Sequence, residues 1–144
     1  MTIWRDGLDP VQTAAEAGAN TLMDSLGIEI IEAGDDWLKG RMPVDHRTKQ
    51  PFGLLHGGAS VALAETIASW AGTLSVGADQ MCVGVEINAN HLRPVTSGWV
   101  YGVATPESRG RTLQVWTVRI SDEAGRLVCI SRMTLAVRAR AGGS

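Results

Sequence analysis

The segment from Gln50 to Ala78 consists almost wholly of hydrophobic and small residues, and Glu65 carries its only formal charge. Between Gly58 and about Thr73, apolar or small side chains occupy nearly every position of the helical turns, among them Val61, Leu63, Ala64, Ile67, Ala68 and Ala71. A helix that is apolar nearly all round belongs inside a protein or in an interface. We therefore predict one long buried helix over residues 58–73.

Strand-like segments lie on both sides of this helix. Residues 28–33 and 37–42 flank a polar turn, which predicts a hairpin. Four further strands are expected, each separated from the next by a short turn, over residues 81–90, 98–105, 112–121 and 126–137. Gaps this short favour antiparallel neighbours, because parallel pairing requires longer crossovers. The pattern predicts an α+β fold in which a four-stranded meander, extended by the hairpin, wraps around the central helix.

The N-terminal region contains two short helical signals. Asp9-Pro10 places a cap and a proline at the start of a helix that runs to Glu16. A further helical turn over residues 21–25 is expected to end at Gly27. A chain of 144 residues has the length of one domain. We assign residues 1–144 to it, with a helical extension over 1–19 and a frayed tail over 139–144.

Composition and charge exclude several classes of partner. The net charge is −2 with both signs interspersed, so no basic surface indicates nucleic acid or membrane binding. The sequence has neither a signal-peptide pattern nor an apolar run that would span a membrane, which predicts a cytoplasmic protein. Cys82 and Cys129 fit no disulfide or metal pattern and are expected to be buried thiols.

Glu65 is the centre of the candidate chemistry. Burying a lone carboxylate is costly unless partners or a proton compensate it. Its helix begins at His56-Gly57-Gly58, where free N–H groups and the helix dipole would favour a developing oxyanion. Glu65 lies roughly 11 to 12 Å further along the helix than Gly57, too far for both to act on one carbon. A second helix, antiparallel across a dimer interface, would bring these groups together.

Three other polar residues are candidates for the same reaction. Ser69 follows Glu65 by four residues and therefore shares its face of the helix. Gln50 and His56 flank the turn before the helix, where they could bind or polarise a carbonyl. On these residues alone, catalysis and a structural role, with His56 as a helix cap, are equally open.

The turn Ser108-Arg109-Gly110-Arg111-Thr112 is the best local candidate for a phosphate site. Arginine side chains and backbone donors around a glycine suit such a group, and Arg93 could add to the same patch. The alternative is a solvated hairpin tip, which is the commoner meaning of such a turn.

Other chemistries lack their motifs. Gly58-Ala59-Ser60-Val61-Ala62 misses the final glycine of a nucleophile elbow, and residues 53–58 lack the Lys-Ser/Thr pair of a P-loop. The three histidines form no metal motif, and His46 and His91, taken singly, are expected on the surface or in loops. We predict neither a metal nor a cofactor.

Three blocks of the sequence resemble the hotdog-fold acyl-CoA thioesterases. The first is QPFGLLHGGA at residues 50–59, followed by Glu65 and Ser69; the second is GVEINANHLRP at residues 84–94. The third is Gly110-Arg111 with Val115-Trp116. The resemblance covers roughly residues 20–138. It is greatest to the 1,4-dihydroxy-2-naphthoyl-CoA hydrolases and the phenylacetyl-CoA thioesterases.

The resemblance implies a hotdog fold and hydrolysis of an aryl-CoA or acyl-CoA thioester, with CoA as part of the substrate. It implies dimers that pair into tetramers, with active sites at the dimer interface. Glu65 would be the nucleophile or general base, and it would face Gln50, His56 and Gly57 of the other subunit. The Gly57 N–H would form the oxyanion hole. Ser69 would position the water or the carboxylate. The CoA moiety would be held by Gly84, His91, Leu92, Arg93, Pro94, Ser108, Arg109, Gly110, Arg111, Thr112 and Leu113. Many relatives have histidine at the position of Ser108, so this chain departs from them at one nucleotide contact.

Two alternatives remain open. A hotdog dehydratase or hydratase acting on a carrier-bound acyl chain pairs a histidine with an acid, which His56 and Glu65 would satisfy. A non-catalytic acyl-CoA-binding module would use the same pocket without turnover. The sequence does not separate a naphthoyl ester from other aromatic or aliphatic acyl groups.

Overall fold

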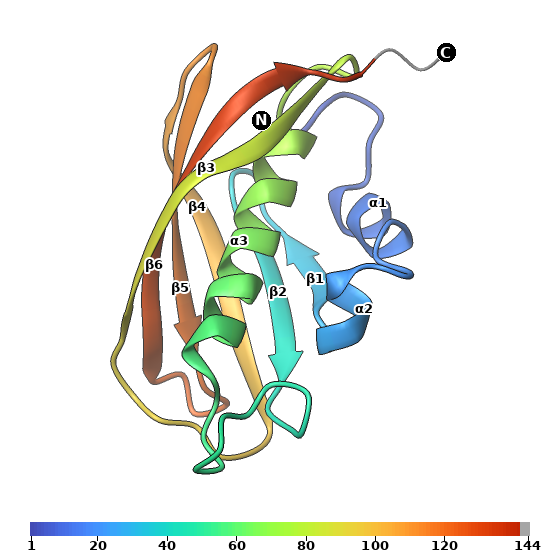
Figure 1. The fold of residues 1–144 in the computed structure, drawn as a ribbon. Coiled ribbons are helices and arrows are strands. Elements are labelled where there is room, and N and C mark those ends of the chain that lie inside the picture. Colours follow the sequence, from blue (N-terminus) through green and yellow to red (C-terminus); the bar gives the residue numbers. More distant parts are fainter. Residues whose placement is uncertain (142–144) are drawn as a thin grey trace.

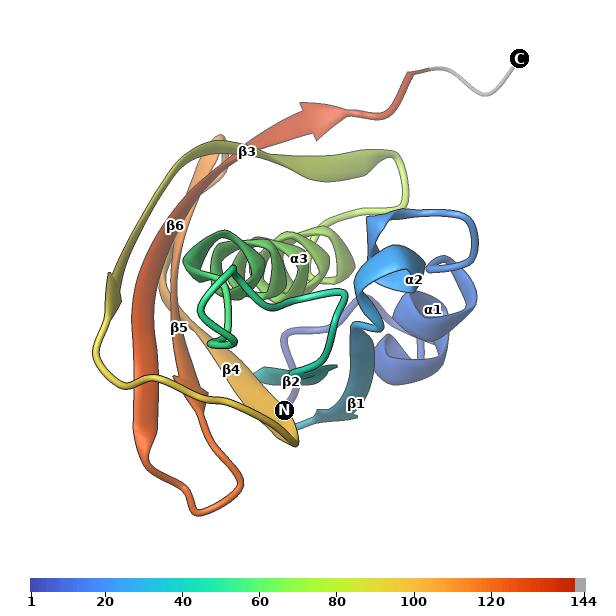
Figure 2. The same ribbon diagram turned by 60° about the horizontal axis from the view of Figure 1, so that its bottom comes forward.

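A six-stranded antiparallel sheet curls around one long helix in the computed structural model, which describes residues 1–141 (Figure 1). The elements in chain order are α1 (Pro10–Glu16), α2 (Leu22–Leu26), β1 (Glu29–Ala33), β2 (Leu38–Pro43), α3 (Gly57–Leu74), β3 (Gln80–His91), β4 (Trp99–Arg109), β5 (Leu113–Ser121) and β6 (Leu127–Ala139). Figure 2 shows the sheet around α3, with α1 and α2 on the side away from β5 and β6. The predicted α+β class and central helix are confirmed.

The strand order differs from the predicted four-stranded meander. The order is β1-β2-β4-β5-β6-β3, so β3 lies at an edge beside β6, and β4 pairs with β2 and β5. The linker after β3 is fixed at both ends: Leu92 N–H donates to the Val128 carbonyl, and Val44 N–H donates to the Gly98 carbonyl. Seven extended residues span roughly 23 Å, enough to cross the end of the sheet. A short gap therefore does not make β3 and β4 neighbours, and that prediction was wrong.

Glycines on two strands let α3 pack closely on the sheet. A Cβ atom at Gly40 on β2 would lie 3.0 Å from Ile67 Cγ1, and one at Gly102 on β4 would lie 2.7 Å from Ile67 Cδ1. The fully buried Trp116 on β5 and Leu63 on α3 belong to the same core. One face of α3 is thereby sealed against the sheet, and the opposite face is left to line a cavity.

The N-terminal helices form where their capping residues predict them. Asp9 accepts hydrogen bonds from the N–H groups of Val11 and Gln12, and Thr21 caps α2. Gly27 ends α2 in the left-handed conformation, with φ of 71°. Within residues 1–141, no helix combines the length and hydrophobicity that a membrane span requires.

The C-terminal end of the sheet extends further than expected. Strand β6 includes Ala139, and the Arg140 N–H donates to the Asp79 carbonyl. The predicted frayed tail over 139–144 is therefore wrong for residues 139 and 140. Residues 142–144 lie outside the described part of the chain.

Both cysteines are buried free thiols, as predicted. Burial raises the pKa of Cys82 to about 11 and also raises the pKa of Cys129. Both side chains therefore remain protonated at neutral pH and act as small core residues.

Candidate active site

The N-terminus of α3 presents one free backbone donor. The Nδ1 atom of His56 caps the helix by accepting a hydrogen bond from the Gly58 N–H at 2.8 Å. The N–H groups of Ala59 and Ser60 both donate to the His56 carbonyl. Within residues 1–141 the Gly57 N–H donates to no acceptor. It is therefore available to an external oxygen at the positive end of the helix dipole.

The cap also fixes the form of the His56 side chain. A neutral imidazole that accepts at Nδ1 carries its proton on Nε2. Because His56 is exposed, its Nε2–H is left as a donor for a ligand. His56 is thus both the structural cap and a candidate for polarising a carbonyl, and the two roles use different nitrogen atoms.

Gln50 presents its amide nitrogen in the same region. Its Oε1 atom accepts hydrogen bonds from the backbone N–H groups of Phe52 and Leu54. With the oxygen committed to the loop, the NH2 group remains as a donor. Gln50 and Gly57 line one cavity of about 370 Å³, together with His91, Leu92, Arg93 and Pro94.

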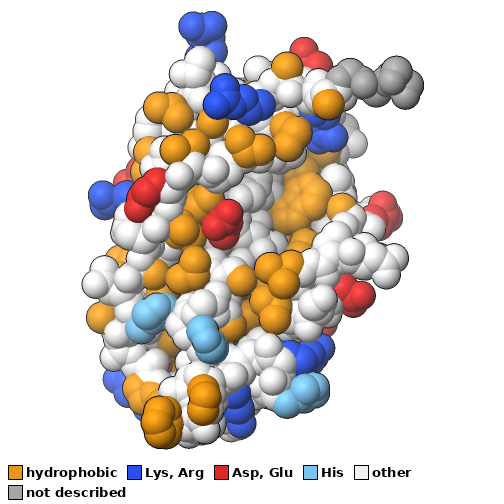
Figure 3. Space-filling model, in the orientation of Figure 1, with side chains coloured by type: hydrophobic (Ala, Val, Ile, Leu, Met, Phe, Trp, Pro, Cys, Tyr) orange, Lys and Arg blue, Asp and Glu red, His pale blue; other side chains and the backbone are white. Residues whose placement is uncertain are grey.

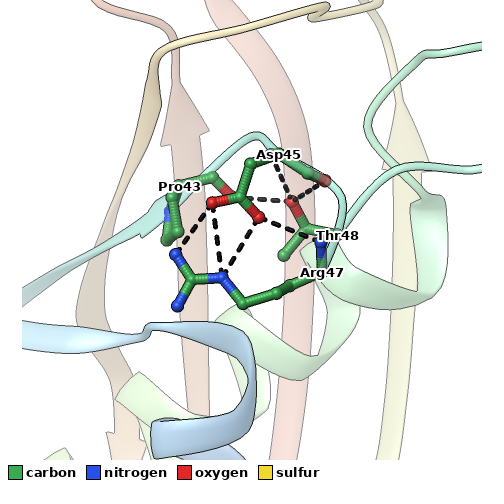
Figure 4. A network of polar contacts seen from close by, with 4 residues as sticks. All are labelled: Pro43, Asp45, Arg47 and Thr48. Carbon is green, nitrogen blue, oxygen red and sulfur yellow. Dashed lines mark hydrogen bonds and ion pairs between the residues drawn. The ribbon is translucent and has the colours of Figure 1, made fainter.

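The loop that carries Gln50 is held by a polar network (Figure 4). The hydroxyl of Thr48, only 2% exposed, donates to the Pro43 carbonyl at 2.7 Å and accepts from the Asp45 N–H. The Arg47 guanidinium pairs with the Asp45 carboxylate at 2.8 Å. The Thr48 carbonyl in turn accepts from the His56 N–H. The network therefore fixes the chain on both sides of the loop that carries Gln50, at Thr48 before it and at His56 after it.

Replacing Asp45 with asparagine is expected to lower the melting temperature at neutral pH but not near pH 2. Hydrogen bonds from Arg47 lower the pKa of Asp45 from 3.8 to about 2 in the folded chain. A lowered pKa stabilises the fold above about pH 4, and that contribution is lost as the pH falls through the folded value. Thermal unfolding of both proteins between pH 7 and pH 2 measures this. A difference in melting temperature that does not shrink towards pH 2 would contradict the ion pair.

Glu65 is half-buried and faces a second, larger cavity. Its Oε2 atom would lie 2.9 Å from a Cβ atom at Gly84, so the carboxylate lies against the bare backbone of β3. No hydrogen bond or ion pair to Glu65 is present within residues 1–141. Ser69 lines the same cavity one turn further along α3. The sequence placed Glu65 in an apolar helix as a candidate catalytic acid, and its position at the cavity leaves the carboxylate able to reach a ligand.

This larger cavity has a volume of about 720 Å³ and lies along the face of α3 that the sheet does not cover (Figure 3). Its residues on α3 recur at helical spacing from Gly58 to Thr73. The opposite wall comes from residues 17–23, which the sequence had not indicated as part of any site. No local signal marks them, because their position depends on how α2 packs against α3.

The structure does not bring all candidates together within one chain. Glu65 and Ser69 line the larger cavity, whereas Gln50 and Gly57 line the smaller one. This separation agrees with the distance expected along the helix.

His91 lies next to the helix N-terminus, where its Nε2 atom would be 2.8 Å from a Cβ atom at Gly57. It begins the segment His91–Pro94 that borders the smaller cavity. The sequence placed His91 on the surface when it was considered alone and at the CoA site by resemblance. Its side chain is exposed and also packs against the proposed oxyanion donor.

The cationic turn lies at the other end of the sheet. Residues Ser108 to Leu113 are all exposed, and the Gly110 N–H donates to the Leu113 carbonyl at 2.8 Å. Leu113 pairs with Ala136 of β6, and Ala136 with Val83 near the start of β3, whereas His91 ends that strand. Arg93 therefore does not join this turn within one chain, because most of the length of β3 separates them.

Comparisons with known proteins agree with these features. A family model described as the thioesterase superfamily matches residues 52–129, more than half of the chain. A 1,4-dihydroxy-2-naphthoyl-CoA hydrolase from Escherichia coli is 53% identical over 120 residues, which are 83% of this chain and 88% of that protein. The proofreading thioesterase EntH of Cronobacter turicensis is 49% identical over 135 residues, which are 94% of this chain and 98% of that protein.

Solved structures extend the similarity to the whole fold. The crystal structure of a thioesterase from Haemophilus influenzae has a TM-score of 0.94 and 48% identity, and the match covers 99% of each chain. The six-stranded sheet around α3, the half-buried acid and these relatives lead to one identification. The chain belongs to the thioesterase superfamily and is a thioester hydrolase with the hotdog fold.

Proposed function

We propose that this enzyme hydrolyses aromatic acyl-CoA thioesters to the free acid and CoA. The observation that carries the proposal is a half-buried Glu65 carboxylate, unpaired within residues 1–141, in a largely apolar cavity of about 720 Å³. A cavity of this size accommodates a drug-sized ligand. The relative from Escherichia coli, whose name gives a naphthoyl-CoA substrate, supports an aromatic acyl group.

In the proposed reaction the thioester carbonyl lies at the N-terminus of α3. The Gly57 N–H stabilises the oxyanion of the tetrahedral intermediate. The His56 Nε2–H and the Gln50 amide NH2 donate further hydrogen bonds to the thioester carbonyl oxygen. Glu65 either takes a proton from attacking water or attacks the carbonyl itself to form an anhydride, which water then hydrolyses. When water attacks, collapse of the tetrahedral intermediate breaks the C–S bond, and Glu65 passes the proton it took from water to the CoA thiolate. In the anhydride route the C–S bond breaks as the anhydride forms, and the departing thiolate takes a proton from solvent. Ser69 orients the water or the carboxylate.

We propose that a second copy of the chain completes each site. Strand β3 is an edge strand, and an edge can pair with another strand through its free backbone groups. Antiparallel pairing of two β3 edges would run the two α3 helices in opposite directions. Glu65 of one copy would then face Gln50, His56 and Gly57 of the other. The same symmetry places the start of one β3 beside the end of the other, so Arg93 and the turn 108–113 of different copies could share one CoA molecule.

We also propose that two such dimers pair into a tetramer. The outer face of the sheet, away from α3, is free of other elements within residues 1–141 (Figure 2). It carries Arg41 over the Trp99 ring at 4.0 Å and Lys39 over the Tyr101 ring at 5.3 Å. Aromatic and arginine side chains of this kind are enriched at protein interfaces.

The test is a panel of CoA thioesters with detection of the free thiol. We expect thiol release with aromatic esters at higher kcat/KM than with acetyl-CoA. Loss of an enoyl absorbance without thiol would indicate a hydratase, and saturable binding without turnover would indicate a binding module. Either result would overturn the proposal. Transfer of labelled solvent oxygen into Glu65 would identify the anhydride route.

A further inference from the structure

The wall of the larger cavity opposite α3 comes from the link between α1 and α2 together with the first turn of α2. Ala17, Thr21, Leu22 and Met23 border the cavity there. Leu22 is 59% exposed and borders the cavity. A large apolar side chain that faces a cavity rather than the core is suited to contact an apolar ligand.

This wall is fixed to α3 by specific contacts. The Trp70 indole N–H donates to the Met23 sulfur at 3.3 Å, and both side chains border the cavity. The Thr21 hydroxyl donates to the Gly18 carbonyl at 2.6 Å and accepts from the Met23 N–H. Because the Thr21 hydroxyl and the Met23 side chain are held in this way, the link has a defined position relative to Glu65.

The cavity suits the acyl group better than the CoA moiety. Its lining is mainly apolar, and among residues 1–141 the one cation that borders it is Arg140, whose guanidinium donates to the Gln80 carbonyl. The phosphates of CoA require cations, which gather in the turn 108–113 instead. Trp70 follows Glu65 by five residues, or roughly 7.5 Å along the helix. A one- or two-ring acyl group would span that distance from its carbonyl.

We propose that residues Ala17–Met23 form the wall against which the acyl group packs, that Leu22 supplies apolar contact to this group, and that the small side chain of Ala17 leaves room for it. The proposal rests on the proposed function in taking the thioester carbonyl to lie at Glu65. In this arrangement the N-terminal link selects the substrate while taking no part in bond breaking. Ala17 and Leu22 are therefore specificity residues that the catalytic step does not require.

The test compares Ala17→Trp with Ala19→Trp. Both alanines are exposed in the same link, but only Ala17 borders the cavity. We expect Ala17→Trp to lower kcat/KM for a naphthoyl-CoA thioester about tenfold or more, within the range that a filled pocket commonly imposes. Acetyl-CoA hydrolysis should change less than about twofold, and Ala19→Trp should leave both substrates within that limit. Equal losses on both substrates, or equal effects of the two tryptophans, would overturn the proposal.

A second variant and a binding measurement separate this proposal from the proposed function. Leu22→Ala, which removes an exposed side chain, should reduce kcat/KM for the naphthoyl ester severalfold and spare acetyl-CoA. Affinity for naphthacyl-CoA, a ketone analogue without a thioester bond, should fall in Ala17→Trp and Leu22→Ala while affinity for free CoA is retained. If the wild type binds this analogue more tightly than either variant does but hydrolyses no thioester, the wall stands and the hydrolase proposal fails. If hydrolysis occurs and neither variant alters selectivity or analogue binding, the wall proposal fails alone.

Discussion

Replacing Glu65 with glutamine is expected to lower kcat on an aryl-CoA thioester by about 10³-fold, as loss of a general base or nucleophile commonly does. The amide has nearly the same shape, so it still fits against Gly84 and in the cavity. It can neither take a proton from water nor attack the carbonyl. KM should change little, because substrate contacts elsewhere in the cavity remain.

The matched control is Glu86→Gln, two residues beyond Gly84 on β3. Glu86 is exposed, and its carboxylate accepts hydrogen bonds from Asn88 rather than facing the cavity. We expect this variant to retain wild-type kcat. Circular dichroism and thermal unfolding should show both variants folded. Near-normal turnover by Glu65→Gln would remove Glu65 from the chemistry.

Replacing Gly84 with alanine is expected to lower kcat roughly 100-fold, because a misplacement of about 1 Å can cost that much. The new methyl group would lie 2.9 Å from Glu65 Oε2 and 2.5 Å from Met133 Cε. The methionine end is flexible and can move, but the carboxylate must leave its position. The resemblance to known thioesterases assigned Gly84 to CoA binding, which would instead raise KM. Separate measurement of kcat and KM distinguishes positioning of Glu65 from binding of CoA.

Gly77→Ala is the matched control for this change. A methyl group at Gly77 would likewise lie 2.9 Å from a carboxylate oxygen, that of Asp79, in an exposed turn outside the cavity. We expect kcat within about twofold of the wild type, as for most surface substitutions. An unchanged kcat in Gly84→Ala would show that contact with Gly84 does not position the carboxylate.

Local features of the fold follow well from the sequence. Asp9-Pro10 marks the start of α1, Gly27 marks the end of α2, and the apolar run marks α3 to within one residue at each end. Strand β4 runs four residues beyond its predicted end because its pairing with β5 continues past Pro106 through a register shift. Local patterns decide where an element forms, but pairing decides how far a strand extends.

Strand order and the surroundings of the site depend on contacts between distant residues. The place of β3 at the edge follows from a linker anchored to β6 and to Val44 just after β2, which no local pattern encodes. Glu65 could be singled out as the one charge in an apolar run, but its contact with Gly84 arises only in the folded chain. The same holds for the wall at residues 17–23. Sequence therefore identifies the reactive group better than the groups that position it.

Mixing two inactive variants would determine whether each active site draws on two subunits. Glu65→Gln removes the acid, and His56→Asn removes the Nε2 donor while asparagine still caps the helix. Co-expressed with different tags and purified as a mixture, the two chains should associate at random. Each mixed dimer would then contain one intact site, and the total activity should be about one quarter of the wild-type value for an isologous dimer. Activity no higher than the residual level of the two variants would show that Glu65 and His56 act within one chain, and it would contradict the shared site.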